Sequence, residues 1–304
     1  MGAEALRPAL ARWLPAAAAA ATGIQVGSSI VATRFVVDQT GPASLALLRY
    51  AIGICCLLPP ALAAARGAPF ARRDLLPIGA LGIGQFGVLI AVLNVGLRTV
   101  PSARAALIFA TFPLLTMVFA AALGRERLTA RKTLGVLLTV VGVGVALGDR
   151  ALERGGAPDR WMGEVAVLAS AAIGAICSVL YRPYLTRYPT LRVSAFAMLA
   201  SVAFLALLAA GEGFFSALPR FTPGGWLAVL FIGVASGAGY FLWMWALGHA
   251  PPTQVTVFLG LSPLTAAALG AWLLHEPVSV TALLGVALVG LGLWLAVGHG
   301  SARD

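Results

Sequence analysis

Polar side chains at helical spacing interrupt the first apolar run of this sequence. Thr22, Gln25 and Ser29 follow one another at intervals of three and four residues, so a helix would place them on one face. Such a row can line a path for a polar molecule, or its hydroxyls can bond back to their own helix and join neighbouring helices. Gln25 is costlier to bury than a hydroxyl, and both readings stay open for it.

Later apolar runs carry further polar and aromatic side chains that could meet a small molecule. They are Gln85, Asn94, Ser170, Tyr181, Ser236, Tyr240, Trp243, Gln254 and Phe258. Gln85 and Asn94 are nine residues apart, so a regular helix turns them to different faces, and we expect at most one of them to face a central path. Tyr240 and Trp243 would suit planar or amphipathic substrates through ring stacking, and the alternative is that they only pack.

Two arginines stand where a substrate could meet them. Arg104 begins the apolar run 102–123 and could attract a substrate carboxylate, because a guanidinium pairs well with that group. The alternative is that its side chain reaches out to the membrane interface. Arg49 lies about two turns inside the run 43–63, where a charge is expensive and needs a partner. The sequence leaves open whether the role of Arg49 is structural or functional.

Acidic side chains are missing from the middle of every apolar run. A proton-coupled exporter of organic cations usually needs a buried carboxylate that exchanges protons for cargo. We therefore expect neutral or zwitterionic cargo that moves down its gradient by facilitated transport. Glu126 and Glu276 stand at the ends of runs, where we expect them to order the turn between a helix and a loop.

The residue types that membrane enzymes need are also missing. An aspartyl protease uses paired aspartates, a lipid-phosphate transferase uses acidic clusters around Mg²⁺, and a metalloprotease uses an HExxH helix. None of these patterns occurs, the chain has three histidines, and Cys55, Cys56 and Cys177 show no metal-ligand spacing. We expect no catalytic residue, no metal site and no cofactor.

The elements that must position these side chains are transmembrane helices. Of the 304 residues, 60% are hydrophobic and 11% are charged, whereas a soluble domain carries about 25% charged residues. The apolar residues form ten runs near the length that crosses a bilayer as a helix. The predicted helices are 13–34, 43–63, 75–97, 102–123, 132–148, 163–182, 192–210, 224–247, 253–274 and 279–298. This predicts an all-α, polytopic membrane protein with ten transmembrane helices.

The net charge of +10 also carries topological information. With ten crossings, 13 of the 21 Lys and Arg residues fall on the side of the chain ends, 7 fall on the other side, and Arg49 lies within a helix. Cationic loops are retained in the cytoplasm, so both termini are predicted to be cytoplasmic. Because the basic residues occupy short gaps between apolar runs, they do not indicate nucleic-acid binding.

The two halves of the chain repeat one another. Shifted by 150 residues, segment 101–148 matches 251–298 without a gap and with 13 identities in 48 positions, among them Pro113 with Pro263. Five helices per half force the second half to start on the other side of the membrane, so the repeats are inverted. We expect one repeat at 1–148, a connection at 149–162 and a second repeat at 163–304. Pro113 and Pro263 would bend their helices as paired hinges or gates, or as static kinks.

Two stretches resemble the EamA-type repeat of the drug/metabolite transporter superfamily. They are GRERLTARKTLGVLLTVVGVGVALG (124–148) after Pro113 and HEPVSVTALLGVALVGLGLWLAVG (275–298) after Pro263. The resemblance implies a ten-helix basket in which helices 1, 3, 4, 6, 8 and 9 enclose the substrate path and helices 5 and 10 are peripheral. The chain is most similar to the YddG-type aromatic amino-acid exporters of that family.

The resemblance also implies what the protein does. It implies export of amino acids and similar amphipathic metabolites across the bacterial inner membrane, with membrane lipids around a monomer or weak homo-oligomer. Transport of nucleotide sugars, lipids or drugs on the same fold, or a membrane assembly subunit without transport, are the alternatives.

Overall fold

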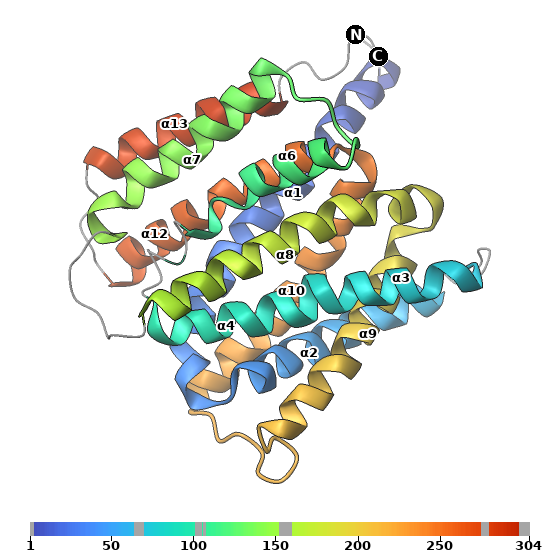
Figure 1. The fold of residues 1–304 in the computed structure, drawn as a ribbon, viewed down its shortest axis with the longest axis vertical. Helices are drawn as coiled ribbons and strands as arrows, with labels where there is room; N and C mark the ends of the chain where they lie inside the picture. Colours follow the sequence, from blue (N-terminus) through green and yellow to red (C-terminus); the bar gives the residue numbers. More distant parts are fainter. Residues whose placement is uncertain are drawn as a thin grey trace.

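The computed structural model describes residues 3–63, 70–100, 105, 108–151, 160–274 and 280–297 of the chain (Figure 1). Within these residues all regular secondary structure is helical. The elements are α1 (Ala3–Val36), η1 (Val37–Gln39), α2 (Pro42–Ala63), α3 (Arg72–Gly82), η2 (Ile83–Val88), α4 (Leu89–Thr99), α6 (Phe112–Ala122), α7 (Ala130–Ala151), α8 (Arg160–Arg187), α9 (Thr190–Gly211), α10 (Pro223–His249), α11 (Pro252–Thr256), η3 (Val257–Gly260), α12 (Leu261–Leu274) and α13 (Val280–Val297).

The helices of the described part group into ten crossing segments, because α3, η2 and α4 are continuous and so are α11, η3 and α12. Six segments are by themselves long and apolar enough to cross a membrane. They are Trp13–Gln39, Pro42–Ala63, Arg72–Thr99, Trp161–Arg187, Thr190–Gly211 and Pro223–His249. The predicted all-α polytopic fold is confirmed, and most of the described segments fall within a few residues of the predicted ranges. The exceptions are α1, which begins at Ala3, ten residues before its predicted start, and α6, which begins at Phe112, ten residues after its predicted start.

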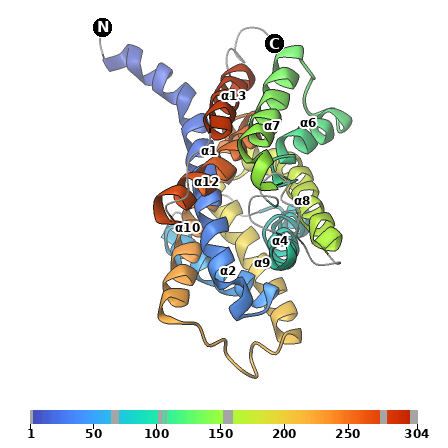
Figure 2. The same cartoon turned by 90° about the vertical axis from the view of Figure 1, so that its left-hand side faces the viewer.

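The first turn of α1 and the last turn of α13 lie at the same end of the molecule (Figures 1 and 2). We call this end, at the upper right of Figure 1, the terminal end, and the other the opposite end. An even number of crossings requires this arrangement. It follows that α1, α3 and α9 start at the terminal end, whereas α2, α8 and α10 start at the opposite end and run back.

The pairing of α7 with α13 shows the inverted repeat directly. A Cβ added to Gly135 would lie 2.8 Å from the carbonyl oxygen of Gly292, and one added to Gly142 would lie 2.9 Å from that of Gly285. Under the 150-residue shift Gly135 corresponds to Gly285, and Gly142 to Gly292. Each glycine therefore meets the counterpart of the other, as a two-fold axis between antiparallel helices requires. Small residues let the two backbones approach this closely.

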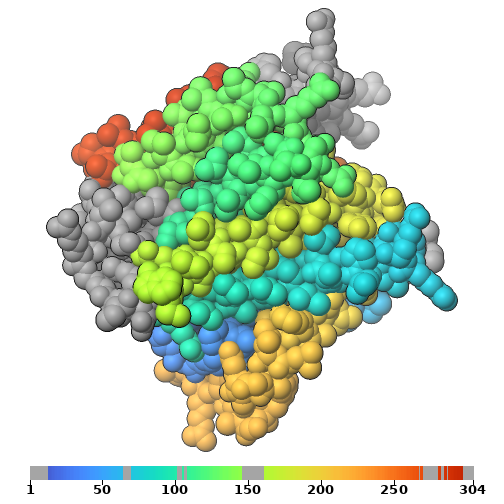
Figure 3. All heavy atoms as spheres, viewed as in Figure 1, coloured from blue at the N-terminus to red at the C-terminus, as the bar shows by residue number. Residues whose placement is uncertain are grey.

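The protein core lies between the remaining helices, away from this pair. One large cluster of buried apolar side chains joins α2, α4, α8, α9 and α10. Figure 3 shows α7, α6, α8 and the α3–α4 segment as successive diagonal bands across one face. Large apolar side chains such as Leu137, Val141 and Leu284 are exposed on α7 and α13. In a membrane protein such surface faces lipid, so these helices form the outer wall and leave the interior to the others.

Candidate functional site

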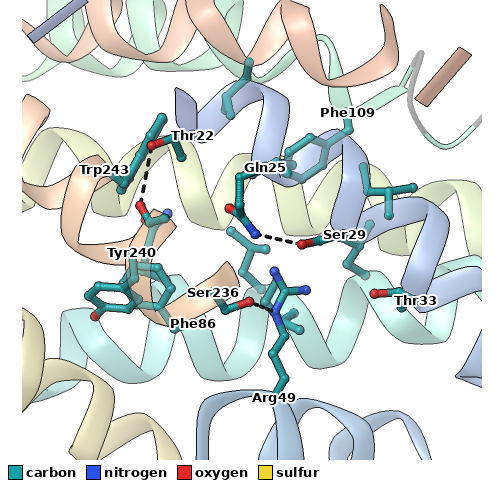
Figure 4. Close-up of a pocket in the computed structure, with 18 of the residues that line it drawn as sticks. Thr22, Gln25, Ser29, Thr33, Arg49, Phe86, Phe109, Ser236, Tyr240 and Trp243 are labelled. Atoms are coloured by element: carbon teal, nitrogen blue, oxygen red, sulfur yellow. Dashed lines mark hydrogen bonds between the residues drawn. The ribbon is translucent and has the colours of Figure 1, made fainter. Parts of the chain in front are cut away.

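Figure 4 shows a cavity between the helices. Its lining residues on α1, α2 and α4 belong to the halves of α1, α2 and the α3–α4 segment nearer the opposite end, so the cavity lies between the middle of the molecule and that end. Its lining comes from α1, α2, η2, α4, α6 with the turn before it, α10 and η3. The lining residues are Thr22, Gln25, Val26, Ser29, Ile30, Thr33, Arg49, Tyr50, Gln85, Phe86, Leu89, Ile90, Leu93, Asn94, Leu97, Phe109, Phe112, Ser236, Gly239, Tyr240, Trp243 and Leu259. Its volume is about 90 Å³; one water needs roughly 10–15 Å³ by this measure, so a compact organic molecule could replace several waters.

The polar row of α1 faces this cavity, as one of the two sequence readings proposed. Gln25 donates a 2.7 Å hydrogen bond from Nε2 to the hydroxyl of Ser29, and Thr22 donates to the carbonyl of Ala18 at 2.9 Å. The other side of α1 carries Gly23 and Gly27, which approach the backbone of η3 and α12 too closely for any side chain. This glycine face fixes the rotation of α1 and so turns the polar row inward.

Gln85 and Asn94 both line the cavity, which overturns the expectation that at most one of them would. The cause is the π-helical segment η2, which lies between them and contains Gln85. A π-bulge inserts one residue into the helix, so side chains nine positions apart no longer point in opposite directions. Asn94 also donates a 3.0 Å bond to the carbonyl of Pro42 and so holds the start of α2.

Two groups of aromatic rings form walls of the cavity. In the first, the rings of Phe86 and Tyr240 lie with centroids 3.5 Å apart, and Tyr50 meets Phe86 edge-on at 5.9 Å. In the second, Phe112 lies 5.4 Å from Phe109 and 6.2 Å from Trp243. Planar groups stack favourably on such walls. Tyr240 and Trp243 were predicted from the sequence. The four other rings were not, although Phe109 and Phe112 share a helical face directly before Pro113.

Arg49 is the one positive charge among the described lining residues. It donates a 2.6 Å hydrogen bond from Nε to the hydroxyl of Ser236, which in turn donates to the carbonyl of Ile232 at 2.5 Å. The described lining contains no Asp or Glu. An arginine in a membrane helix costs on the order of 3 kcal/mol even in the mildest measurements, so a position without a counter-ion is a candidate for a functional site.

Some buried polar atoms of the cavity residues have no hydrogen-bond partner. They are Oε1 of Gln85 and the indole Nε1 of Trp243. Gln85 and Trp243 are each 5% exposed. Buried polar groups are nearly always paired, and clusters of exceptions point to a ligand that completes them.

Other predicted site residues lie away from the cavity. Ser170 donates to the carbonyl of Val167 in its own helix, and Tyr181 is fully buried between helices. No residue of α8 lines the cavity, although the resemblance implied that helix 6 would, and α2 contributes Arg49 and Tyr50 instead.

The ninth crossing segment also presents a different face from the one predicted. Its contribution to the cavity is Leu259 and not Gln254 or Phe258. The reason is that η3 is a tight 3-10 segment, which rotates its residues relative to a regular α-helix. Arg104 lies outside the described residues.

The two repeat-related prolines sit directly after breaks in their helices. Pro113 is the second residue of α6, and the chain before it makes a tight bond from the amide of Thr111 to the carbonyl of Ile108. Pro263 is the third residue of α12, directly after η3. A proline lacks the N–H that would continue the earlier helix, so both breaks follow from the sequence. Their role as hinges or gates stays a prediction.

Glu126 lies in the turn between α6 and α7 of the first repeat. Its carboxylate accepts a 3.1 Å hydrogen bond from the backbone amide of Thr253, at the start of α11, and lies 3.4 Å from Nζ of Lys132. It thus joins the two repeats at the terminal end, beyond the role in a local turn that was expected. The other member of the pair, Glu276, lies outside the described residues.

This architecture corresponds to a known family. The EamA-like transporter family matches residues 13–148 and again 161–298. The chain belongs to the EamA-like transporter family. It is therefore a multi-pass membrane transporter of small molecules and not an enzyme, with two inverted five-helix repeats.

Individual EamA-like relatives support the same assignment. The chain is 30% identical over 253 residues to the aromatic amino acid exporter YddG of Ancylobacter novellus, covering 78% of this chain and 85% of the relative. It is 30% identical over 286 residues to a probable terminal-alkyne amino-acid exporter of Streptantibioticus cattleyicolor, covering 90% of both chains. A crystal structure with 26% identity matches 95% of this chain and 96% of that chain with a TM-score of 0.76.

Proposed function

We propose that this EamA-like transporter exports amino acids, aromatic amino acids in particular, across the bacterial inner membrane. The cavity carries the proposal. It combines two aromatic walls with a row of amide and hydroxyl groups and a single arginine, among described lining residues that include no acid. A zwitterion with an apolar or aromatic side chain is complementary to that combination. Two relatives named as exporters of amino acids support it.

The same lining disfavours the other cargoes. A nucleotide sugar carries a diphosphate, which needs several cationic or amide donors, and the described lining offers one arginine. A lipid needs a lateral opening between helices, whereas this cavity is bounded by residues from many segments. An organic cation would need a carboxylate to pair with, and the described walls have none.

Transport would proceed by alternating access between the repeats. The two moving units are 1–148 and 163–304, joined by 149–162, with Pro113 and Pro263 at the hinges. In the present conformation the cavity lies toward the opposite end, and fully buried side chains of α8 and α10, such as Tyr181 and Leu247, fill the terminal side. With both termini in the cytoplasm, the opposite end would face outward, and movement would be facilitated and driven by the substrate gradient.

Reconstitution tests the proposal. Proteoliposomes of the purified chain are loaded with unlabelled phenylalanine, and exchange is measured with labelled Phe, Trp, Thr and an unrelated sugar. We expect saturable exchange of Phe and Trp, weaker exchange of Thr and none of the sugar. Amino-acid flux no greater than that of empty vesicles would overturn the proposal.

A further inference from the structure

The guanidinium of Arg49 is held at one edge and free at the other. Its Nε bonds to Ser236, and no other hydrogen bond or ion pair of this side chain occurs with the described residues. Because Ser236 donates its own proton to Ile232, its oxygen is left to accept from Arg49. The fixed Nε therefore orients the planar group and leaves its two terminal NH₂ groups for another partner.

Those two NH₂ groups point into the cavity. Figure 4 shows Arg49 rising from α2 toward the pair formed by Gln25 and Ser29 on α1, with Ser236 at its side. Neither Gln25 nor Ser29 carries a negative charge, and the described lining residues supply none. The charge of a membrane-buried guanidinium without a protein counter-ion is neutralised only when a ligand supplies the anion.

We propose that Arg49 binds the carboxylate of the transported amino acid and is the residue that selects for it. This inference rests on the proposed function and names the group that the same cavity recognises. A guanidinium with two parallel N–H groups free binds a carboxylate in a bidentate way, which fixes the direction of the ligand as well as its charge. Ser236 acts as a positioning residue, since it holds Nε and leaves the ligand to the terminal nitrogens.

The rest of an amino acid finds complementary groups near this anchor. Gln25 uses Nε2 to donate to Ser29, so its Oε1 remains an acceptor for an ammonium group, and Oε1 of Gln85 has no partner. The ring would lie against the wall formed by Phe86 and Tyr240. Amide oxygens bind an ammonium without adding a negative charge, so the net positive charge of Arg49 still requires the carboxylate.

A purely structural Arg49 would behave differently. It would tie α2 to α10 through the single bond to Ser236 and rest against the Tyr50 ring, with its CZ atom 5.6 Å from the ring centroid. Removing it would then impair all substrates equally. A carboxylate anchor instead discriminates between ligands that differ only in that group, and this difference makes the two roles separable.

The experiment compares competitors of labelled phenylalanine binding to the purified full-length chain. The competitors are phenylalanine, phenylalaninamide, which keeps the ring and the amine but lacks the carboxylate, and 3-phenylpropionate, which keeps the carboxylate but lacks the amine. For the unmodified chain we expect phenylalaninamide to bind at least about ten-fold more weakly than phenylalanine. Arg49→Gln should lose about ten-fold or more in phenylalanine affinity and should no longer distinguish the two.

Three further variants sharpen the result. Arg49→Lys keeps the positive charge but lacks the two parallel N–H groups. Its affinity for phenylalanine should lie between those of the unmodified chain and Arg49→Gln. Ser236→Ala releases Nε of Arg49 and should lower the affinity for phenylalanine by only a few-fold. This variant should still bind phenylalanine more tightly than phenylalaninamide. Arg98→Gln removes an exposed arginine that donates a hydrogen bond to the carbonyl of Thr40. It should leave the affinities for phenylalanine and phenylalaninamide unchanged.

The possible failures can be told apart. If the unmodified chain does not bind phenylalanine at all, the proposed function is wrong. If it binds and transports phenylalanine but binds phenylalaninamide equally well, or if Arg49→Gln keeps the preference, the function stands and the role of Arg49 is overturned. Should Arg49→Gln fail to fold, the comparison of competitors on the unmodified chain and on Arg49→Lys still decides the question.

Discussion

Nη1 of Arg187 lies 2.9 Å from Oδ2 of Asp74, although the two residues are 113 positions apart in the chain. Tyr188 donates its hydroxyl to the same oxygen at 2.5 Å. Asp74 begins α3 in the first repeat, and Arg187 ends α8 in the second, so this cluster ties the repeats together at the terminal end. Because the cavity lies toward the opposite end, we expect this cluster to act as a latch that keeps the terminal end closed.

Weakening this latch should shift the protein toward the state that opens at the terminal end. The pair is partly exposed, so Asp74→Asn should raise the population of the open state only about three- to ten-fold. The readout is the rate at which a water-soluble maleimide labels a cysteine placed at the fully buried Leu247, in a chain without its native cysteines.

A matched control for the latch lies at the opposite end. Arg34 and Asp38 also form an ion pair, at 3.3 Å, but both belong to the end of α1 and the turn after it and do not link the repeats. Asp38→Asn should leave the labelling rate unchanged. Equal rates for Asp74→Asn and the parent chain would contradict a latch at Asp74.

The contact between α7 and α13 makes a prediction about stability. A Cβ at Gly142 would lie 2.8 Å from the amide nitrogen of Val289, a backbone atom that cannot move alone, whereas a Cβ at Gly290 meets nothing within 4 Å. Gly142→Ala should therefore lower the free energy of unfolding by about 1–3 kcal/mol. Gly290→Ala should be neutral or stabilising by up to about 1 kcal/mol, because alanine favours the helix.

Thermal unfolding in detergent, read with a thiol-independent probe, compares the two variants. A melting temperature for Gly142→Ala at or above that of Gly290→Ala would show that the helices adapt without cost, against the close packing described.

The acidic side chain after α9 predicts a local effect on hydrogen exchange. Glu212 accepts hydrogen bonds from the backbone amides of Ala43 and Ser44 at 3.0 and 2.8 Å. These amides lie in the first turn of α2 and have no acceptor within the helix. A negative charge at this position also interacts favourably with the helix dipole. Glu212→Gln should speed exchange at both amides by about ten-fold. The amide of Gly225, which Thr222 caps at 3.1 Å, should exchange as before.

The sequence predicted the frame of this molecule well. Apolar length located the crossing segments, and the fixed 150-residue shift, which pairs Pro113 with Pro263, gave the inverted repeat. Both follow from strong constraints, because a bilayer sets helix length and a duplicated chain keeps its prolines and glycines in register.

The candidate site was less accessible, since side-chain direction depends on local departures from the regular helix. The π-helical η2 brought Gln85 and Asn94 into one cavity, and the 3-10 segment η3 turned Phe258 away in favour of Leu259. Neither departure has a clear sequence signal. Arg49 was visible as an expensive charge, but its exposure to the cavity depends on the packing of α2 against α10, which only the fold provides.

The ring of Tyr240 makes the last prediction, because it separates stacking from hydrogen bonding. Its ring lies against Phe86, while its hydroxyl meets the hydroxyl of Tyr181. If the cavity recognises aromatic cargo by stacking, Tyr240→Leu should weaken phenylalanine binding about three- to ten-fold, the worth of one aromatic pair. Tyr240→Phe keeps the ring and should lower the affinity for phenylalanine less than Tyr240→Leu does.

Binding of labelled phenylalanine and labelled leucine to each variant distinguishes the causes. Loss of stacking reduces the ratio of the phenylalanine affinity to the leucine affinity, whereas general damage lowers both affinities together. A larger loss for Tyr240→Phe than for Tyr240→Leu would instead assign the hydroxyl to the substrate, and the wall would then bind through its polar edge.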